Sequence, residues 1–154
     1  MEWSLTGIGI FFSAMGFMMV LVQGPLLKRA SMIWSDRLLV LGGTLVLAAS
    51  FVFFASQATR VIYVGTALLA LGNGLMWPSL LAILSKATDR SVQGAVQGFA
   101  SSTAAVASIT GLLVGGLLYG SIGANMFFIS AAVMAPVFII ALAMPRLGRM
   151  PTLG

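Results

Sequence analysis

The stretch "GLLVGGLLYGSIGANMFFISAAVMA" (residues 111–135) decides the kind of fold, because it contains no charged residue. The charge-free region around it extends over residues 91–145. An uncharged apolar run of about 18 residues or more is a candidate for spanning a membrane. Residues 91–145 are too long for one crossing, so we expect them to fold back. The glycines, serine and asparagine of "YGSIGAN" (residues 119–125) predict the position of that turn.

The composition of the whole chain agrees with a membrane environment. Of its 154 residues, 60% are hydrophobic and only 7% are charged, whereas a soluble domain carries about 25% charged residues. Lipid offers no hydrogen-bond partner to the backbone, so spanning segments must be helices or closed barrels. The apolar runs lack the strict alternation of barrel strands, which need only about 9–11 residues. The sequence therefore predicts an all-α membrane protein.

The apolar runs divide the chain into five predicted transmembrane helices within one domain, residues 1–154. The runs are separated by short polar or charged segments and by the turn described above. The predicted spans are residues 5–27, 38–55, 61–85, 98–118 and 126–144.

The basic residues predict the orientation of these helices. Loops on the cytoplasmic side of a membrane carry an excess of lysine and arginine. On the five-helix prediction Arg60 stands alone on one side, which places the N-terminus outside and the C-terminus inside. A net charge of +5 does not indicate nucleic-acid binding here, because the basic residues are few and flank apolar runs. The basic residues of the opposite, cytoplasmic side are Lys28, Arg29, Arg37, Lys86, Arg90, Arg146 and Arg149.

Several kinds of chemistry are excluded by residue type. The chain has no cysteine and no histidine, so we expect no disulfide, no thiol chemistry, no metal site and no cofactor. Its three acids are Glu2, Asp36 and Asp89, and all are predicted to lie outside the spans. Without a paired carboxylate inside a span, the chain is not expected to be an enzyme.

Small residues recur at helical spacing in the first and fourth spans. Small residues four apart let helices approach closely in lipid, so these glycines are predicted to pack against other helices: Gly9, Gly16, Gly111, Gly115, Gly116 and Gly120. Polar residues accompany them in the fourth span. Because polar side chains facing lipid are costly, Gln97, Ser101 and Ser108 are candidates for the wall of a polar cavity, and helix packing alone is the alternative.

The third span contains a proline in its interior. Pro78 cannot donate a hydrogen bond to the carbonyl of Gly74, and its ring crowds that carbonyl. Gly72, Gly74 and Pro78 are therefore a predicted helix hinge. Asn73 and Trp77 are four residues apart and share a helix face, which makes them candidate substrate-binding residues. The alternative is an ordinary kinked helix in which Asn73 bonds a neighbour.

The order of these features resembles the C-terminal half of a major facilitator superfamily transporter, and more narrowly the drug:proton antiporters that include tetracycline efflux proteins. The matching stretches are "GPLLKR" (residues 24–29), "GNGLMWPSLLAILSKATDRSVQGAVQGFASS" (residues 72–102) and "GLLVGGLLYG" (residues 111–120). The resemblance implies that residues 1–154 are a single partial transporter domain. Its five spans would be helices eight to twelve of the complete transporter, which are five of the six helices of the C-terminal half. This chain departs from the family pattern at Lys28, where the family has an acid, and at Leu112, where close relatives often have proline.

The resemblance also implies site roles and partners. It implies cytoplasmic loops that take part in gating, with Lys28, Arg29, Asp36, Arg37, Asp89 and Arg90 as candidates, although a solvated loop is the alternative for Asp89 and Arg90. The expected location is the bacterial inner membrane. The expected partners are the lipid bilayer, the N-terminal half of a transporter, a small hydrophobic drug, and protons carried through that other half.

Two functions remain open on the sequence. The first is the C-terminal part of a secondary active transporter for tetracycline-like drugs, which is incomplete on its own. The second is a truncated or accessory membrane protein that packs against another transporter half without transporting anything itself.

Overall fold

The computed structural model describes residues 4–56 and 58–143, and within these residues the chain contains helices and no strand. The N-terminal ends of two helices are capped by serine side chains, which accept hydrogen bonds from the amides of Gly7 and Leu38. The elements are α1 Leu5–Leu21, η1 Val22–Leu26, α2 Leu27–Ile33, α3 Asp36–Ala55, α4 Thr59–Lys86, α5 Gln93–Ile122, η2 Gly123–Asn125 and α6 Met126–Ala143.

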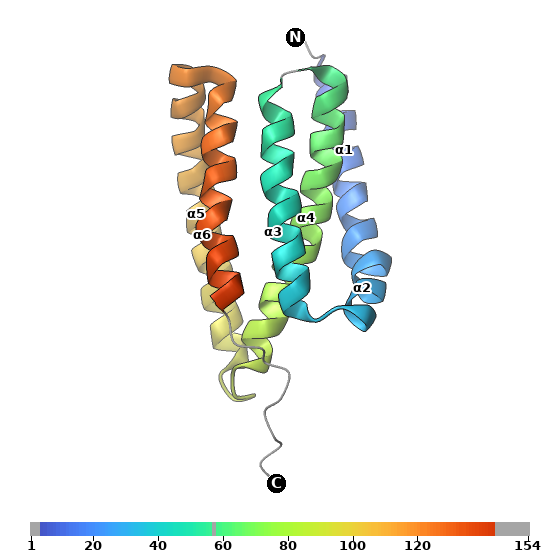
Figure 1. The fold of residues 1–154 in the computed structure, drawn as a ribbon, viewed down its shortest axis with the longest axis vertical. Coiled ribbons are helices and arrows are strands. Elements are labelled where there is room, and N and C mark those ends of the chain that lie inside the picture. Colours follow the sequence, from blue (N-terminus) through green and yellow to red (C-terminus); the bar gives the residue numbers. More distant parts are fainter. Residues whose placement is uncertain (1–3, 57, 144–154) are drawn as a thin grey trace.

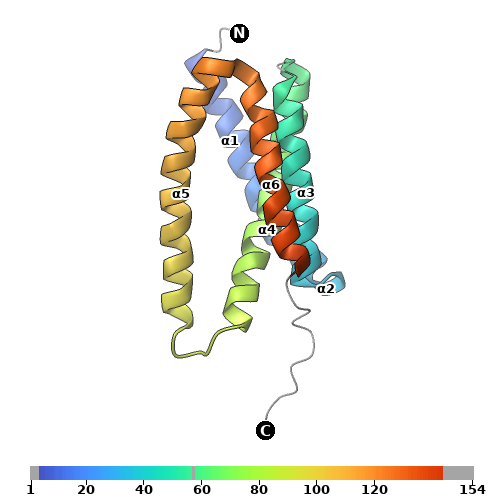
Figure 2. The same cartoon turned by 60° about the vertical axis from the view of Figure 1, so that its left-hand side comes forward.

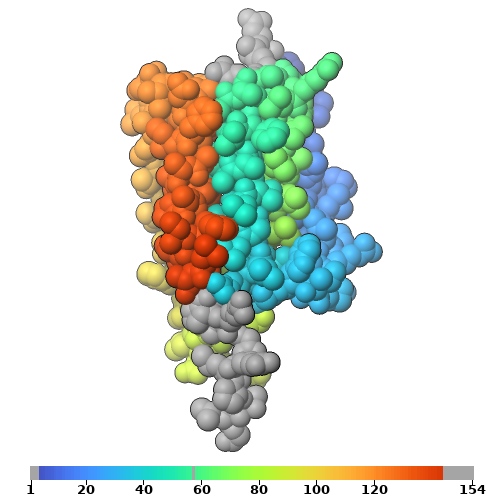
Figure 3. Space-filling model, in the orientation of Figure 1, coloured from blue at the N-terminus to red at the C-terminus, as the bar shows by residue number. Residues whose placement is uncertain are grey.

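The long helices run up and down along one axis of the molecule (Figures 1 and 2). α3 packs most extensively against α4 and next against α6, so it lies between them. α1 and η1 pack on another side of α4, whereas α5 contacts α4 and α6 only lightly. Figure 3 shows α6 and α3 closely packed on the front face, with α4 and α1 following to one side. α3 and α4 thus form the centre of this part of the chain.

The helices are long and apolar enough to cross a membrane in four continuous segments of the described residues: Leu5–Ile33, Asp36–Ala55, Thr59–Lys86 and Gln93–Ala143. The last segment has 51 residues and consists of α5, η2 and α6. Figure 2 shows that α5 and α6 are connected at one end and run back from that turn, diverging away from it. The fold-back that the sequence predicts is therefore present. The number of membrane crossings and their orientation remain predictions.

The fold-back occurs at a glycine with a special backbone conformation. Gly123 has φ of 59° and ψ of −141°, a region that residues with a side chain rarely adopt. α5 continues to Ile122, so the turn occupies only the last three residues of the predicted segment, Gly123–Asn125. The glycine at position 120, which the same segment offered as a turn residue, lies inside α5.

The first helix differs from its prediction. It does not end before Lys28 and Arg29, because the chain continues as η1 and α2 to Ile33. Pro25 lies in η1, a π-helical turn in which the amide of Leu27 bonds the carbonyl of Val22, five residues back. A π turn can absorb a break in the helical hydrogen bonds. The next residues include good helix formers, so the helix resumes and Lys28 and Arg29 lie in it rather than in a loop.

The other helices begin and end within a few residues of their predicted bounds. α4 extends through Pro78, and α5 is longer at both ends than the predicted span 98–118. The predicted end of the last span at residue 144 lies outside the described residues, as does Glu2. The tail with Arg146 and Arg149 lies outside them too.

Glycines from both helices lie buried in the α3–α4 interface, where they bring the two backbones close together. A Cβ atom placed on Gly43 would lie 2.7 Å from the carbonyl oxygen of Gly72, and one placed on Gly72 would lie 2.8 Å from the carbonyl oxygen of Gly43. The buried hydroxyl of Thr44 in this interface donates a hydrogen bond within its own helix, to the carbonyl of Val40 at 2.8 Å. In lipid, such close approach of backbones is what holds helices together.

Candidate functional site

Gly74, one helical turn before the proline in α4, lies against the π turn of the first helix. Pro78 leaves the carbonyl of Gly74 without its helical donor. Val22, the first residue of η1, packs against Gly74: a Cβ placed there would lie 2.5 Å from Val22 Cγ1, 3.0 Å from Val22 Cβ and 3.6 Å from Gln23 Cγ. This contact therefore joins two helical segments that each contain an internal proline.

Gly72 and Gly74 pack against neighbouring helices on two different sides of α4. Gly72 contacts Gly43 and Leu47 of α3, while Gly74 contacts Val22 of η1. The sequence assigned both glycines to a hinge, and the structure shows that both are also packing residues. We did not predict from the sequence that Gly43 packs against α4. The pair Gly42–Gly43 in the middle of an apolar run is only a weak indication of it.

Asn73 and Trp77 lie on α4 between these contacts and the proline. Both side chains are half-buried. No hydrogen bond to either side chain is found within residues 4–56 and 58–143. In the described part of the chain, Asn73 therefore does not bond a neighbour as the alternative expected. An amide and an indole N–H in the middle of a membrane helix are both available for a partner.

Ser79, the residue after the proline, is a third polar group in this region. Its side chain is 2% exposed, and its hydroxyl has no hydrogen-bond partner among the described residues. The other buried hydroxyls of the α3–α4 core, such as those of Thr44 and Ser50, bond their own helix. The unpaired hydroxyl adds to the local weakness of α4 after Pro78.

The polar residues predicted on α5 are not brought into contact with those of α4. Gln97, Ser101 and Ser108 are exposed, and no residue of α5 is buried. Figure 2 shows α4 and α5 joined at one end and diverging away from it. The shared substrate site of Asn73, Trp77 and these three residues remains a prediction.

The glycines predicted to pack on α1 and α5 touch almost nothing within the described residues. A Cβ on Gly9, Gly16, Gly111, Gly116 or Gly120 would meet no atom within 4 Å, and one on Gly115 would lie 3.6 Å from Met126 Cε. Their packing role remains a prediction that would need partners beyond these helices. An open hollow of about 630 Å³ lies on α1, lined by Thr6, Gly9, Ile10, Ser13, Ala14 and Phe17.

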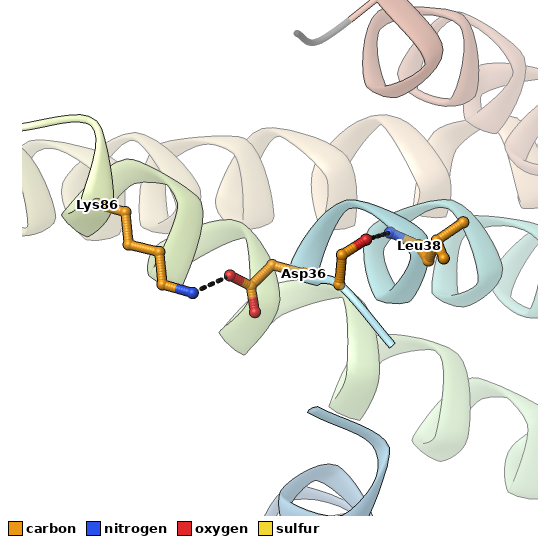
Figure 4. Close-up of polar contacts among 4 residues, drawn as sticks. Asp36, Leu38 and Lys86 are labelled. Atoms are coloured by element: carbon orange, nitrogen blue, oxygen red, sulfur yellow. Dashed lines mark hydrogen bonds and ion pairs between the residues drawn. The ribbon is translucent and has the colours of Figure 1, made fainter. Parts of the chain in front are cut away.

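An ion pair joins the ends of α3 and α4. Lys86 Nζ lies 2.5 Å from Asp36 Oδ2, and the lysine side chain is 65% exposed whereas the aspartate is 19% exposed. Figure 4 shows the two side chains pointing toward each other from the two helices. Asp36 lies in the first turn of α3 and Lys86 in the last turn of α4. A negative charge at the start of a helix and a positive charge at its end both interact favourably with the helix dipole. The sequence singled out Asp36 but missed Lys86 as its partner.

The next residue, Arg37, forms hydrogen bonds with a third helix, α6. Arg37 donates from Nε to the carbonyl of Ala141 at 3.1 Å and from Nη2 to the carbonyl of Leu142. These carbonyls belong to the last turn of α6 as the structure describes it. Through Asp36 and Arg37, the first turn of α3 connects the ends of α4 and α6.

The remaining predicted gating residues make no such contacts. Lys28, Arg29, Asp89 and Arg90 form no ion pair within the described residues, whose one ion pair is Lys86–Asp36. The α4–α5 loop is instead closed by Gln93, whose side-chain amide donates to the carbonyl of Ser85 at 3.1 Å. Asp89 and Arg90 are exposed, as the solvated-loop alternative predicts. No group of three potential acidic, cysteine or histidine metal ligands occurs in the described part of the chain.

The sequence is similar to those of known transporters. The sequence model of the Major Facilitator Superfamily matches residues 1–152. The class C tetracycline resistance protein of Escherichia coli is 26% identical over 151 residues, which are 96% of this chain and 37% of that protein. The uncharacterized MFS-type transporter YttB of Bacillus subtilis (strain 168) is 24% identical over 139 residues, 88% of this chain and 35% of that protein.

A third relative is the class B tetracycline resistance protein of Escherichia coli, which is 24% identical over 117 residues, 76% of this chain and 29% of that protein. The chain thus spans only 29–37% of the length of the curated relatives that it matches. No solved structure is similar enough to count as a match. The family match extends over nearly all of the all-helical, multi-pass chain, and the chain therefore belongs to the Major Facilitator Superfamily of membrane transporters.

Proposed function

We propose that this chain forms helices eight to twelve of a bacterial inner-membrane transporter that exports tetracycline-like drugs in exchange for protons. Two of the three relatives described above are tetracycline resistance proteins. The stretches around Pro78 and residues 111–120 resemble the same antiporters. On this proposal the chain is a part of a transporter and not an enzyme.

The observation that carries the proposal is the unpaired polar and aromatic face of α4. Asn73 and Trp77 are half-buried, four residues apart, and without a hydrogen-bond partner among the described residues. An unsatisfied polar group at membrane depth is expensive unless it lines a cavity or binds a ligand. A drug-sized molecule would supply an apolar face for the indole and hydrogen-bond partners for the amide.

Proton coupling is assigned to the other half of the transporter. Pumps and transporters generally move protons through a carboxylate or histidine inside the membrane. The acids of this chain are Glu2, Asp36 and Asp89; the described two lie at the start of α3 and in the α4–α5 loop. Substrate in this fold binds between the two halves. We therefore define the complete transporter as this chain joined to the N-terminal helices that the proposal requires.

The proposal is tested by changing Asn73 and Trp77 in the complete transporter. Asn73→Ala and Trp77→Ala should alter the ratio of resistance between two tetracycline-like drugs by roughly 10-fold, because one lost hydrogen bond or ring contact is worth about 1–1.5 kcal/mol. Val64→Ala is the matched control, since Val64 lies on the same helix and is 48% exposed. Resistance is measured against membrane abundance.

The two outcomes of this experiment are clearly separated. If resistance to every drug falls only in proportion to the amount of protein in the membrane, Asn73 and Trp77 are structural residues and the binding role is wrong. A changed drug ratio at normal abundance, absent in the Val64 variant, supports it.

A further inference from the structure

The first helix is too long to lie entirely inside a bilayer core. Leu5–Ile33 has 29 residues, which at 1.5 Å per residue extend about 43 Å, whereas the hydrocarbon core is about 30 Å thick. The helix contains no acid and no base before Lys28. Its excess length therefore falls at the end that carries Lys28 and Arg29, so that α2 lies at the depth of the lipid headgroups.

The position of α2 in the fold agrees with this depth. Figures 1 and 2 both show α2 at the level of the first turns of α3, while the end of α4 and the start of α5 project further. Asp36 and Arg37, at the start of α3, are charged and half-buried, as expected for a helix end that leaves the core. α2 thus lies closer to the bilayer than the α4–α5 loop does.

One face of α2 combines bases and large apolar side chains. Ala30 is buried against the protein, whereas Lys28 and Arg29 are exposed. Met32 and Ile33 follow them by four residues and are 72% and 76% exposed. Residues four apart lie on one face of a helix, so each base has an apolar side chain one turn away.

The residue after α2 extends this face, because Trp34 is 54% exposed. Tryptophan is enriched at the membrane–water interface, where its amphipathic ring sits at headgroup level. Apolar side chains beside bases are the composition of segments that lie in a membrane surface.

The two bases of α2 carry charge that the described protein does not neutralise. Asp36 is engaged by Lys86, and Lys28 and Arg29 form no ion pair within residues 4–56 and 58–143. Basic residues at a membrane surface are attracted to anionic lipids. We propose that α2 and Trp34 form an interfacial anchor that binds the headgroups of anionic phospholipids, with Lys28 and Arg29 on the phosphates and Trp34 at the headgroup level.

The anchor is tested by energy transfer from Trp34 to labelled lipids. The chain is reconstituted in phosphatidylcholine vesicles as a Trp3→Phe/Trp77→Phe variant, so that Trp34 is the single donor. Trace headgroup-labelled phosphatidylglycerol or phosphatidylcholine is the acceptor. We expect more transfer to the phosphatidylglycerol probe, and we expect high salt to reduce the difference because it screens the charges.

Three variants separate charge from folding. Lys28→Gln/Arg29→Gln should weaken phosphatidylglycerol binding by roughly fivefold per removed charge and equalise the two probes. Lys28→Arg/Arg29→Lys should keep the preference. Arg60→Gln, which removes an exposed base at the opposite end of α4, is the matched control and should also keep it. The charged side chains are exposed, so circular dichroism should be unchanged.

Several outcomes would overturn the anchor. Equal energy transfer from Trp34 to both lipid probes in the parent protein would show that this face of α2 does not select anionic lipid. The face would then be available to bind another protein. A preference that survives Lys28→Gln/Arg29→Gln would place the lipid elsewhere. Stronger quenching of Trp34 by lipids labelled in mid-chain than by lipids labelled in the headgroup would contradict the assigned depth.

Discussion

Replacing Gly72 with alanine is expected to separate α3 from α4 and to remove most of the folded protein from the membrane. The added Cβ would lie 2.8 Å from the carbonyl oxygen of Gly43 and 2.8 Å from the amide nitrogen of Leu47. Both atoms belong to the backbone and cannot rotate away. Overpacking a core typically costs about 1–3 kcal/mol, and a contact against backbone should reach or exceed the upper end of that range.

The experiment compares membrane abundance and thermal unfolding of matched glycine variants. Gly43→Ala should behave like Gly72→Ala, since its Cβ would lie 2.7 Å from the carbonyl oxygen of Gly72. Gly9→Ala is the control, because nothing lies within 4 Å of its added Cβ, and alanine is in addition the better helix former. Equal unfolding temperatures for Gly72→Ala and Gly9→Ala would refute the close α3–α4 contact.

Gly74→Ala is expected to disturb transport by the complete protein through the contact between η1 and α4. The new Cβ would lie 2.5 Å from Val22 Cγ1 and 3.0 Å from Val22 Cβ. Valine is stiff about its first side-chain torsion, so one of the two backbones must move. Because the contact lies beside Pro78 and the π turn with Pro25, the displacement falls on the weakest points of both helices.

A second substitution tests whether Val22 is the cause. Val22→Ala removes both Cγ atoms, and the double variant Val22→Ala/Gly74→Ala should recover at least half of the transport activity lost in Gly74→Ala, measured per amount of membrane protein. This would be a positive coupling between neighbouring sites. Purely additive losses in the double variant would mean that Val22 and Gly74 do not act on each other.

The helical regions could be predicted from the sequence because their cause is local. A run of apolar residues without charge must satisfy its own backbone in lipid, and this holds for α3, α4 and α6 whatever surrounds them. The turn at Gly123 was predictable for the same reason, since its backbone conformation suits glycine. The continuation past Pro25 was not predictable, because a π turn and a helix end are both compatible with proline in an apolar run.

The packing glycines show what a local sequence pattern cannot predict, namely which helix face contacts a neighbour. Gly9 and Gly16 of α1 are seven residues apart and so lie close to one face of the helix. A Cβ added at either glycine would meet nothing within the described residues, whereas Gly43 lies against Gly72. Helical periodicity indicates which residues share a face, but the neighbouring helix decides which face is used. The exposed small faces of α1 and α5 are the surfaces on which the proposed N-terminal helices would pack.

The charged residues at the helix ends show the same limit of prediction from sequence. Asp36, Arg37 and Lys86 were all expected on one side of the membrane, but the sequence did not indicate that Lys86 pairs with Asp36 or that Arg37 bonds the last carbonyls of α6. Both contacts depend on α3 lying between α4 and α6. They connect one end each of α3, α4 and α6; a role of this end in gating remains a prediction.

The most direct test of the proposed function is drug accumulation in sealed vesicles with an imposed pH gradient. The complete transporter should accumulate a tetracycline-like drug only while the gradient is present. This chain alone should give the level of empty vesicles, because it contributes neither the intramembrane proton carrier nor the second wall of the substrate site. Gradient-dependent accumulation by this chain alone, or its absence with the complete transporter, would contradict the proposal.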